Sequence, residues 1–337
     1  MRRAEKLGLI AGLLLLAYLV YLSDPRLLWE YLARVQWGLL LLLAITAVRH
    51  AVRTLACRLV LGEDRGQISF ATMYAVLLVS EAVKFVLVAA GILGEAARVA
   101  LIRHRVTGPR AVSSVLLDVL LFNLTSVLLL LGGTALFFAR VPDARSVRNA
   151  GAIGAAVIAG VTLLLFVALQ QRWLTASRFA SAIAGTRSAW LHGARQWVGR
   201  HREKFRETDA QLFDFYARHP GLFFGNFLLN LLSQGFAALE VFAVFGLLGL
   251  PLGPVEAVAL EALKKLSGIA GFVVPGSLGV YEGGLALVSQ ALGMSVAAGV
   301  AIGLVRKMRA IVWAALGFAV LAWWRRGESS STGGSRP

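Results

Sequence analysis

Glutamate and lysine occur three residues apart in two otherwise apolar stretches of this chain, at Glu81 and Lys84 and again at Glu261 and Lys264. This spacing puts both side chains on one face of a helix, where an exposed pair contributes only about 0.2–0.5 kcal/mol. A charge near the middle of a bilayer costs about 2.5–3.5 kcal/mol on insertion scales. We therefore expect these pairs to line a protein-walled or water-filled cavity, which suits the passage of a polar group through a membrane.

More charged residues follow each pair along the chain. Glu95 and Asp118 come after the first pair, and Arg306, Lys307 and Arg309 interrupt the last apolar stretch. Three cations so close together would attract a phosphate group. Both halves of the chain therefore contain charged residues that we expect to be buried, and the second half has more cations.

The segment 274–284 is the most distinctive stretch of the sequence. Pro275 cannot donate a backbone hydrogen bond, and its glycines, among them Gly276 and Gly279, permit positive φ angles, so we predict a broken helix. Free N–H groups and the positive helix end beside a break suit an anionic head group. A tight turn is the simpler alternative, but it does not explain Glu282 within the break. The predicted translocation residues are Glu81, Lys84, Glu95, Asp118, Glu261, Lys264, Lys265, Pro275, Gly276, Gly279, Glu282, Arg306 and Lys307.

Several polar residues also have a simpler interpretation. Glu81 and Lys84 would suit helix ends at the membrane surface as well as a cavity, and for Arg98 the surface position is the preferred interpretation. A row of amides at four-residue spacing is explained by hydrogen bonds between helices, worth about 0.6–2 kcal/mol each. These amides are Asn226, Asn230 and Gln234.

The elements that must position these residues are apolar helices. Of the 337 residues, 58% are hydrophobic and 15% are charged, which is typical of an all-α polytopic membrane protein. The first apolar stretch has a poor cleavage site after it, so we expect a retained span and no cleaved signal. The stretches that approach the ~20 residues needed to cross a bilayer are 7–22, 38–48, 111–139, 151–169, 222–250 and 296–324.

The net charge of +16 would indicate nucleic acid as a partner of a soluble protein. Here basic residues in cytoplasmic loops account for it, and we expect no nucleic-acid partner. Cys57 is the only cysteine, so no intramolecular disulfide forms. No Cys/His cluster has the spacing of a metal site, and we expect neither a metal nor a cofactor.

Loop charges predict the course of the chain. Both flanks of segment 68–97 are basic, so this segment is expected to leave and re-enter the cytoplasmic side as a re-entrant hairpin, with Gly91 and Gly94 at its bend. Segment 251–292 is the corresponding hairpin on the outer side. Segment 170–220 has nine Lys and Arg against four acids, which indicates cytoplasmic amphipathic helices. The prediction is six full spans and two re-entrant helical hairpins, with both termini cytoplasmic.

This course divides the membrane region into two halves that form an inverted repeat. The first repeat covers 1–140 and holds the cytoplasmic-side hairpin at about 68–97. The second covers 150–326 and holds the basic segment 170–220 and the outer-side hairpin at about 251–292. Residues 327–337 are expected to be a disordered tail.

These residues resemble a known family, the lysylphosphatidylglycerol synthase transmembrane domain family, whose members are flippase-like. The resemblance lies in Glu81, Lys84, the run from Gly94 to Val99, Asp118 and the run from Pro275 to Gly284, although Ser277 stands where the family commonly has Gly. The second half, from Ala238 to Glu261 and on to Lys307, is also similar to the hopanoid-biosynthesis-associated branch. Two-domain members carry a soluble aminoacyl-transferase domain that makes the lipid. This chain ends at Pro337 without one, so we expect no synthase activity.

The function expected from these residues is translocation of a lipid between the leaflets of a bacterial inner (cytoplasmic) membrane. The resemblance implies a phospholipid, an aminoacylated lipid or an isoprenoid or hopanoid lipid. A non-transporting scaffold for lipid-modifying enzymes, docked through 170–220, is the alternative, and a membrane-embedded lipid-modifying enzyme is a weaker one. Membrane lipids are the expected partners, with lipid-biosynthetic enzymes and further copies of the chain as additional candidates. No catalytic residue is expected, because a nucleophile such as Ser277 needs an adjacent base and His50 is the only histidine inside a predicted span.

Overall fold

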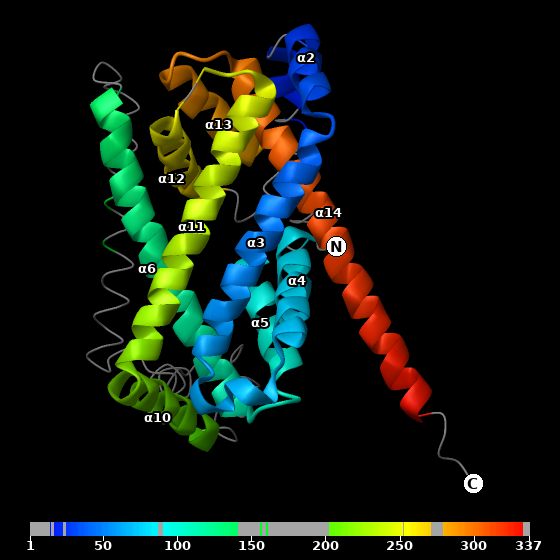
Figure 1. Ribbon diagram of the computed structural model, residues 1–337, viewed down its shortest axis with the longest axis vertical. Coiled ribbons are helices and arrows are strands. Elements are labelled where there is room, and N and C mark those ends of the chain that lie inside the picture. Colours follow the sequence, from blue (N-terminus) through cyan, green and yellow to red (C-terminus); the bar gives the residue numbers. More distant parts are fainter. Residues whose placement is uncertain are drawn as a thin grey trace, which may run out of the picture.

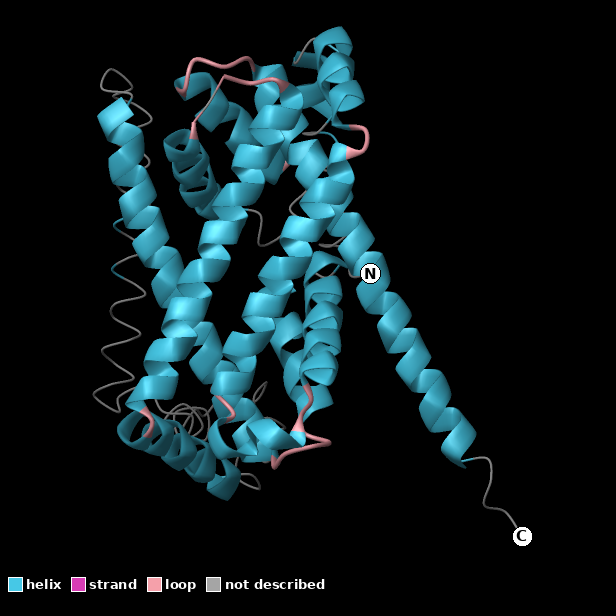
Figure 2. Ribbon diagram, viewed as in Figure 1, coloured by secondary structure: helices cyan, strands magenta, loops and turns pink. Residues whose placement is uncertain are grey.

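The computed structural model arranges helices along one long axis (Figure 1). Every regular element that it describes is a helix (Figure 2). This agrees with the all-α membrane protein predicted from composition. The described residues are 14, 17–22, 25–86, 90–140, 156, 160, 202–251, 253–270 and 279–332.

Within the described residues, three helices are long and apolar enough to cross a membrane: α3 (Gly38–Leu59), α6 (Gly108–Arg140) and α11 (Pro220–Leu248). A rise of 1.5 Å per residue gives the 22 residues of α3 a length of about 33 Å, which matches a hydrocarbon core. The sequence prediction ended this span at residue 48 and was wrong there. Because the helix continues to Leu59, Arg53 lies inside it and not in a basic loop.

Four shorter helices form two pairs at opposite ends of the molecule. The helices α4 (Phe70–Val86) and α5 (Ala90–Ile102) pack together in the lower half of Figure 1, and α12 (Pro254–Ala270) and α13 (Val280–Ala291) pack in the upper half. The longest of them has 17 residues, or about 26 Å, which is less than a bilayer core.

The four long helices run in both directions along this axis. In Figure 1, α3 descends and α6 ascends, whereas α11 ascends and α14 (Val296–Thr332) descends. The central contact is between α3 and α11, and α14 packs along both α4 and α13. The order long, short, short, long therefore occurs twice, and the second set runs opposite to the first.

Glycines allow the closest of these helix contacts. Gly133 of α6 lies against Ala262 of α12, and Gly317 of α14 lies against the Leu78 backbone of α4, so a Cβ at either position would collide. Small residues at helix interfaces serve the same purpose in many membrane proteins. Gly94 plays a similar part inside α5. The prediction that Gly91 and Gly94 form the hairpin bend is wrong, because both lie within α5.

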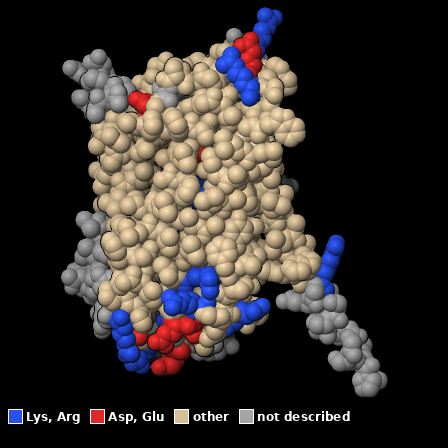
Figure 3. All heavy atoms as spheres, viewed as in Figure 1, with Lys and Arg blue, Asp and Glu red and all other residues tan. Residues whose placement is uncertain are grey.

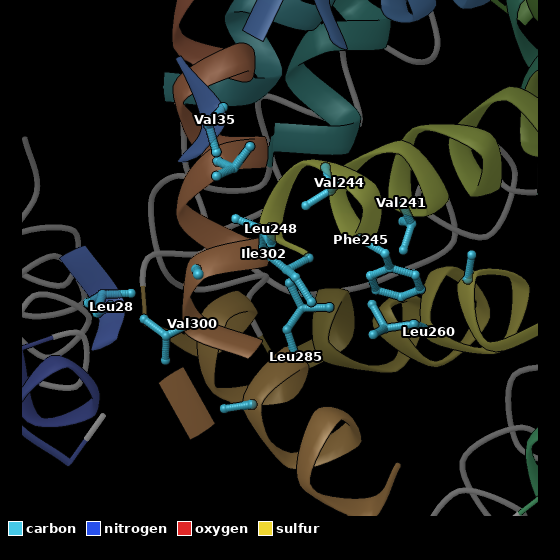
Figure 4. Close-up of a cluster of buried hydrophobic side chains, with 14 of the residues drawn as sticks. Leu28, Val35, Val241, Val244, Phe245, Leu248, Leu260, Leu285, Val300 and Ile302 are labelled. Atoms are coloured by element: carbon cyan, nitrogen blue, oxygen red, sulfur yellow. The ribbon is translucent and has the colours of Figure 1, made fainter. Parts of the chain in front are cut away.

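Two apolar cores fill the two ends of the molecule. The upper core joins α2 (Pro25–Val35), α11, α12, α13 and α14, with Phe245, Leu260 and Ile302 at its centre (Figure 4). The lower core joins α3, α4, α5 and α6 around Met73 and Leu77. Each short helix pair is thus anchored to its own end of the molecule.

The surface has the pattern of a membrane protein. Figure 3 shows charged side chains gathered at the two ends of the long axis and a broad band between them that is almost free of charge. Large apolar side chains are exposed along this band, as expected for contact with lipid. Examples are Leu41, Leu116, Leu228, Phe242 and Ile311.

Two predicted segments are only partly described. Within segment 170–220, α10 (Arg202–Arg218) is a helix at the lower end, beside the 3₁₀ helix η1 (Gly62–Gln67). The predicted span 151–169 lies outside the described residues except for Ala156 and Gly160. In the predicted tail, α14 continues through 327–332 to Thr332, and 333–337 lie outside the described residues. An existing helix extends residue by residue without a new nucleation step, which explains the continuation.

Candidate functional site

Asp118 of α6 is the centre of a buried ion-pair cluster in the lower half. Its carboxylate lies 3.0 Å from Arg53 of α3 and 2.8 Å from Arg98 of α5. It also accepts a hydrogen bond from Asn226 of α11 at 3.1 Å. The Asp118 side chain is only 1% exposed, so these partners replace the water that a buried carboxylate loses.

The predicted pair on α4 joins the same cluster. Lys84 lies 2.9 Å from Glu81 and 2.7 Å from Glu95 of α5, and Glu95 in turn lies 2.7 Å from Arg98. Lys84 therefore connects the two short helices of the lower pair. The Glu81 side chain is 41% exposed and is the least buried member.

The charges of this group, which we call the lower cluster, balance. Three carboxylates face three cations: Glu81, Glu95 and Asp118 against Arg53, Lys84 and Arg98. The surface position preferred for Arg98 was wrong, because Arg98 is 1% exposed and among the largest fully buried side chains. Its place on α5 beside α6 gives it two carboxylates, and these carboxylates make its burial possible.

Arg306 of α14 is the centre of a second cluster, in the upper half. Its guanidinium lies 2.9 Å from Glu240 of α11 and 2.8 Å from Glu261 of α12. Glu261 also pairs with Lys264, and Glu240 also pairs with Arg309. Both carboxylates are at most 2% exposed, so each is held between two cations in the interior.

Glu282 and Lys307 extend this cluster to α13. Lys307 of α14 lies 2.6 Å from Glu282, and the same carboxylate accepts a hydrogen bond from the backbone N–H of Gly279 at 2.8 Å. Gly279 precedes α13 with φ +75°, a conformation that favours glycine. Glu282 therefore caps its own helix and also holds α14.

The charges of this second group, the upper cluster, do not balance. Three carboxylates face five cations: Glu240, Glu261 and Glu282 against Lys264, Lys265, Arg306, Lys307 and Arg309. Lys265 contacts no carboxylate among the described residues. Its ammonium donates to Gln234 of α11 at 3.1 Å and to Ser126 of α6 at 3.3 Å.

The polar side chains of α11 connect the two clusters. Asn226, Asn230, Gln234 and Glu240 are all buried on this helix. Asn226 bonds the central carboxylate of the lower cluster, and Asn230 donates to Asn226 at 2.7 Å. Gln234 accepts from Lys265, and Glu240 belongs to the upper cluster. We call this row the α11 seam, and it runs through the apolar interior from one cluster to the other.

A cavity of about 260 Å³ opens beside the upper cluster. Its wall combines α3, α4, α12, α13 and α14, so it lies where both short helix pairs approach the long helices. Among the described residues none of those that line it is acidic. They are Arg49, Phe85, Lys264, Tyr281, Arg306, Lys307, Arg309 and Ala310.

The structure brings most of the predicted residues into these two clusters. Glu81, Lys84, Glu95 and Asp118 lie in the lower one, and Glu261, Lys264, Lys265, Glu282, Arg306 and Lys307 in the upper one; Pro275 and Gly276 lie outside the described residues. Sequence reasoning left four partners out of the predicted site: Arg53, Arg98, Glu240 and Arg309. Glu240 is the single charge within the apolar helix α11, and that isolation was an available signal for it, whereas Arg53, Arg98 and Arg309 lie near other charges in the sequence.

The fold and these buried charges define a polytopic helical membrane protein. The model of the family described as Lysylphosphatidylglycerol synthase TM region matches residues 7–326 of the chain, so the chain belongs to this family. The matched region is a transmembrane region and not a catalytic domain. Similarity to the hopanoid-associated branch stays a prediction. No curated protein and no solved structure matches the chain.

Proposed function

We propose that this protein is a lipid translocase that moves a polar head group between leaflets along the α11 seam. The observation that carries the proposal is the continuous row of buried polar groups between the two clusters. Isolated charges in hydrocarbon are costly, and they mark substrate pathways in many membrane proteins. A path of this kind lets the head group exchange one set of polar partners for another while the acyl chains stay in the bilayer.

The arrangement of the helices supports an inverted repeat around this path. The set α3 to α6 and the set α11 to α14 run in opposite directions, and their short pairs lie in opposite halves (Figure 1). In inverted-repeat transporters, broken helices meet near the midplane and the substrate site lies between the repeats. We infer that α4 and α5 form one re-entrant hairpin and α12 and α13 the other, as the loop charges predicted.

The two clusters then have different roles in transport. The upper cluster, which borders the cavity, binds the head group, and Lys264, Arg306 and Lys307 change partners between their carboxylates and the substrate. The balanced lower cluster holds α3, α5, α6 and α11 together at the other end of the path. We assign Glu81 and Lys84, the most exposed pair of the lower cluster, to the end of the path where the head group leaves the protein.

The orientation proposed from loop charge places the lower end in the cytoplasm of a bacterium. Basic residues gather at this end, around the end of α3 and from the end of α5 into the start of α6, in accord with the positive-inside rule. They include Arg58, Arg65, Arg103, Arg105 and Arg110. Both termini would then be cytoplasmic, and the membrane would be the inner one.

The scaffold alternative depends on segment 170–220. Of this segment the structure describes α10 and the residues after it, and α10 is strongly charged, with exposed Arg206 and Arg218. Deleting residues 170–200 would abolish recruitment by a scaffold while leaving lipid exchange by a translocase. No feature of the described clusters favours bond-breaking chemistry, so we propose transport without catalysis.

Reconstitution into liposomes with fluorescent phospholipids tests the proposal. Dithionite quenches only the outer leaflet, so exchange appears as loss of the protected fraction with time. We expect exchange faster than in protein-free liposomes, and slower in Glu282→Gln and Arg306→Ala. Arg105→Gln, on an exposed cation at the lower end, is the matched control and should exchange like the wild type.

Monodisperse elution of each variant in detergent shows that it is folded before its rate is compared. Exchange no faster than in protein-free liposomes for all lipids tried would overturn the proposal. Equal rates in the folded Glu282→Gln and Arg306→Ala variants and in the wild type would overturn the assignment of the path.

A further inference from the structure

The wall of the upper cavity has a surplus of positive charge. Five cations line it, and the three carboxylates that pair with them lie behind the wall, fully buried. Among the described residues, these five cations thus exceed the carboxylates paired with them by two charges. Such a surplus of positive charge favours an anionic ligand by electrostatic attraction.

Arg49 of α3 shows where part of this surplus is located. It lines the cavity opposite α14, and no carboxylate among the described residues lies within ion-pair distance of it. Its guanidinium is rigid, planar and suited to bidentate contact with phosphate oxygens. Arg49 therefore offers a binding partner whose engagement breaks no existing ion pair.

The cavity is poorly suited to a head group that carries an ammonium. An ammonium binds carboxylates, carbonyls or aromatic faces, but the described wall has five cations that repel it, and Lys307 already lies over the Tyr281 ring. The volume of about 260 Å³ is also at the small end for a ligand site. Both properties favour a compact anion over an aminoacylated head group.

We propose that the upper cavity binds a phosphate monoester at the head of a lipid, with Arg49 as its anchor. A phosphate monoester carries about −1.5 to −2 charges at pH 7, which matches the surplus of two, whereas a phosphodiester carries about −1. This inference rests on the proposed function and names the substrate class of the same site. A terminal phosphate also places all its oxygens at the tip of the lipid, where the cations of the cavity wall can contact them.

Calorimetric titration of the full chain in maltoside micelles at pH 8 tests this assignment. The probe is dodecyl phosphate, and its control is dodecyl methyl phosphate, which has the same chain and one negative charge fewer. We expect dodecyl phosphate to bind at least about tenfold more tightly. Equal affinities for the two amphiphiles would overturn the assignment of a monoester.

Inorganic phosphate distinguishes a lipid head group from free phosphate. We expect it to bind at least about tenfold more weakly than dodecyl phosphate, because it gains nothing from the apolar surface around the cavity. Binding as tight as that of the amphiphile would overturn the lipid part of the proposal.

Substitutions of Arg49 test whether it contributes to the phosphate site. Arg49→Gln should weaken dodecyl phosphate binding about tenfold, and Arg49→Lys should recover part of the loss. Arg105→Gln should leave the affinity unchanged, and an Arg49→Gln variant that binds like the wild type would overturn the role of Arg49. Lipid exchange without monoester preference would refute this inference alone, whereas monoester binding without lipid exchange would refute the transport proposal alone.

Discussion

The two buried clusters lie on helix sets with the same order of long and short helices, yet they differ in charge. Each begins with a Glu–Lys pair on the first short helix, Glu81 with Lys84 and Glu261 with Lys264. They diverge at the last long helix of each set. In the lower cluster α6 contributes Asp118, whereas in the upper cluster α14 contributes a group of cations that includes Arg306.

This difference teaches how one helical plan can serve two purposes. In the lower cluster every charge has a partner, so the ion pairs connect helices and leave no charge for a ligand. In the upper cluster the carboxylates hold the cations in place but do not neutralise them. A site that is to bind an anion needs such an incomplete balance, and its cost in stability is offset when the ligand enters.

Asp118→Asn should give the largest effect on stability. It leaves Arg53 and Arg98 buried without their shared carboxylate, and removal of one member of a buried ion pair costs about 3–5 kcal/mol. Chemical unfolding in detergent measures the loss. Asp64→Asn, at the partly exposed pair with Arg110, is the control and should cost about 1 kcal/mol or less. Similar losses for both variants would contradict the central role of Asp118.

Glu240→Gln tests the stability of the upper cluster, as Asp118→Asn tests that of the lower one. The two variants should respond differently to an added anion. The change removes a carboxylate shared by Arg306 and Arg309 and should cost about 2–4 kcal/mol. Dodecyl phosphate should raise the thermal midpoint of Glu240→Gln by more than that of the wild type, because the surplus is larger. Dodecyl phosphate should not restore the thermal midpoint of Asp118→Asn. A rescue of both variants to the same extent would show that the clusters do not differ in anion binding.

Gly133→Ala tests whether the contact between α6 and α12 depends on the absence of a Cβ. The added methyl group would collide with Ala262, so we expect a loss of about 1–3 kcal/mol from overpacking. Gly132→Ala, one residue earlier, faces open space and should change the unfolding free energy by less than about 1 kcal/mol. Equal changes in the two variants would mean that these helices are not in contact there.

Arg49→Gln should have the smallest effect on stability. Arg49 forms no ion pair with a described carboxylate, so its loss should change the unfolding free energy by less than about 1 kcal/mol. Its effect should fall on phosphate binding instead. A loss of more than about 2 kcal/mol without ligand would show a structural role for Arg49 and weaken its assignment as an anchor.

Much of the membrane plan could be predicted from the sequence. Apolar composition indicates the class, and the resemblance around Glu81, Asp118 and Glu282 led to the family that the comparison confirms. The α11 amides were also interpreted well, since Asn226 donates to the Ala56 carbonyl of α3 and Asn230 accepts from Arg53 of the same helix α3. Hydrophobic periodicity and the free-energy cost of a charge in a membrane depend only on neighbouring residues, so both can be judged from the sequence.

The partners of each charge could not be predicted in this way. Arg98 resembles a helix-end cation in sequence, and only the packing of α5 against α6 shows that it faces Asp118. The sequence prediction placed the hairpin bend at Gly91 and Gly94. Gly94 instead lies in α5 at its contact with α4, where the Ser80 hydroxyl donates to the Gly94 carbonyl at 2.8 Å, and this contact cannot be seen in the sequence. Such pairings arise between helices distant in sequence, where spacing carries no information.

The most direct test of this account compares two matched lysines in the leaflet-exchange assay. Lys264→Gln and Lys84→Gln each remove the cation of a Glu–Lys pair, one in the upper cluster and one in the lower. Measured per folded protein in proteoliposomes with fluorescent phosphatidic acid, we expect Lys264→Gln to slow exchange about tenfold and Lys84→Gln by less than about threefold. Equal slowing, or a larger effect of Lys84→Gln, would contradict the claim that the upper cluster binds the head group.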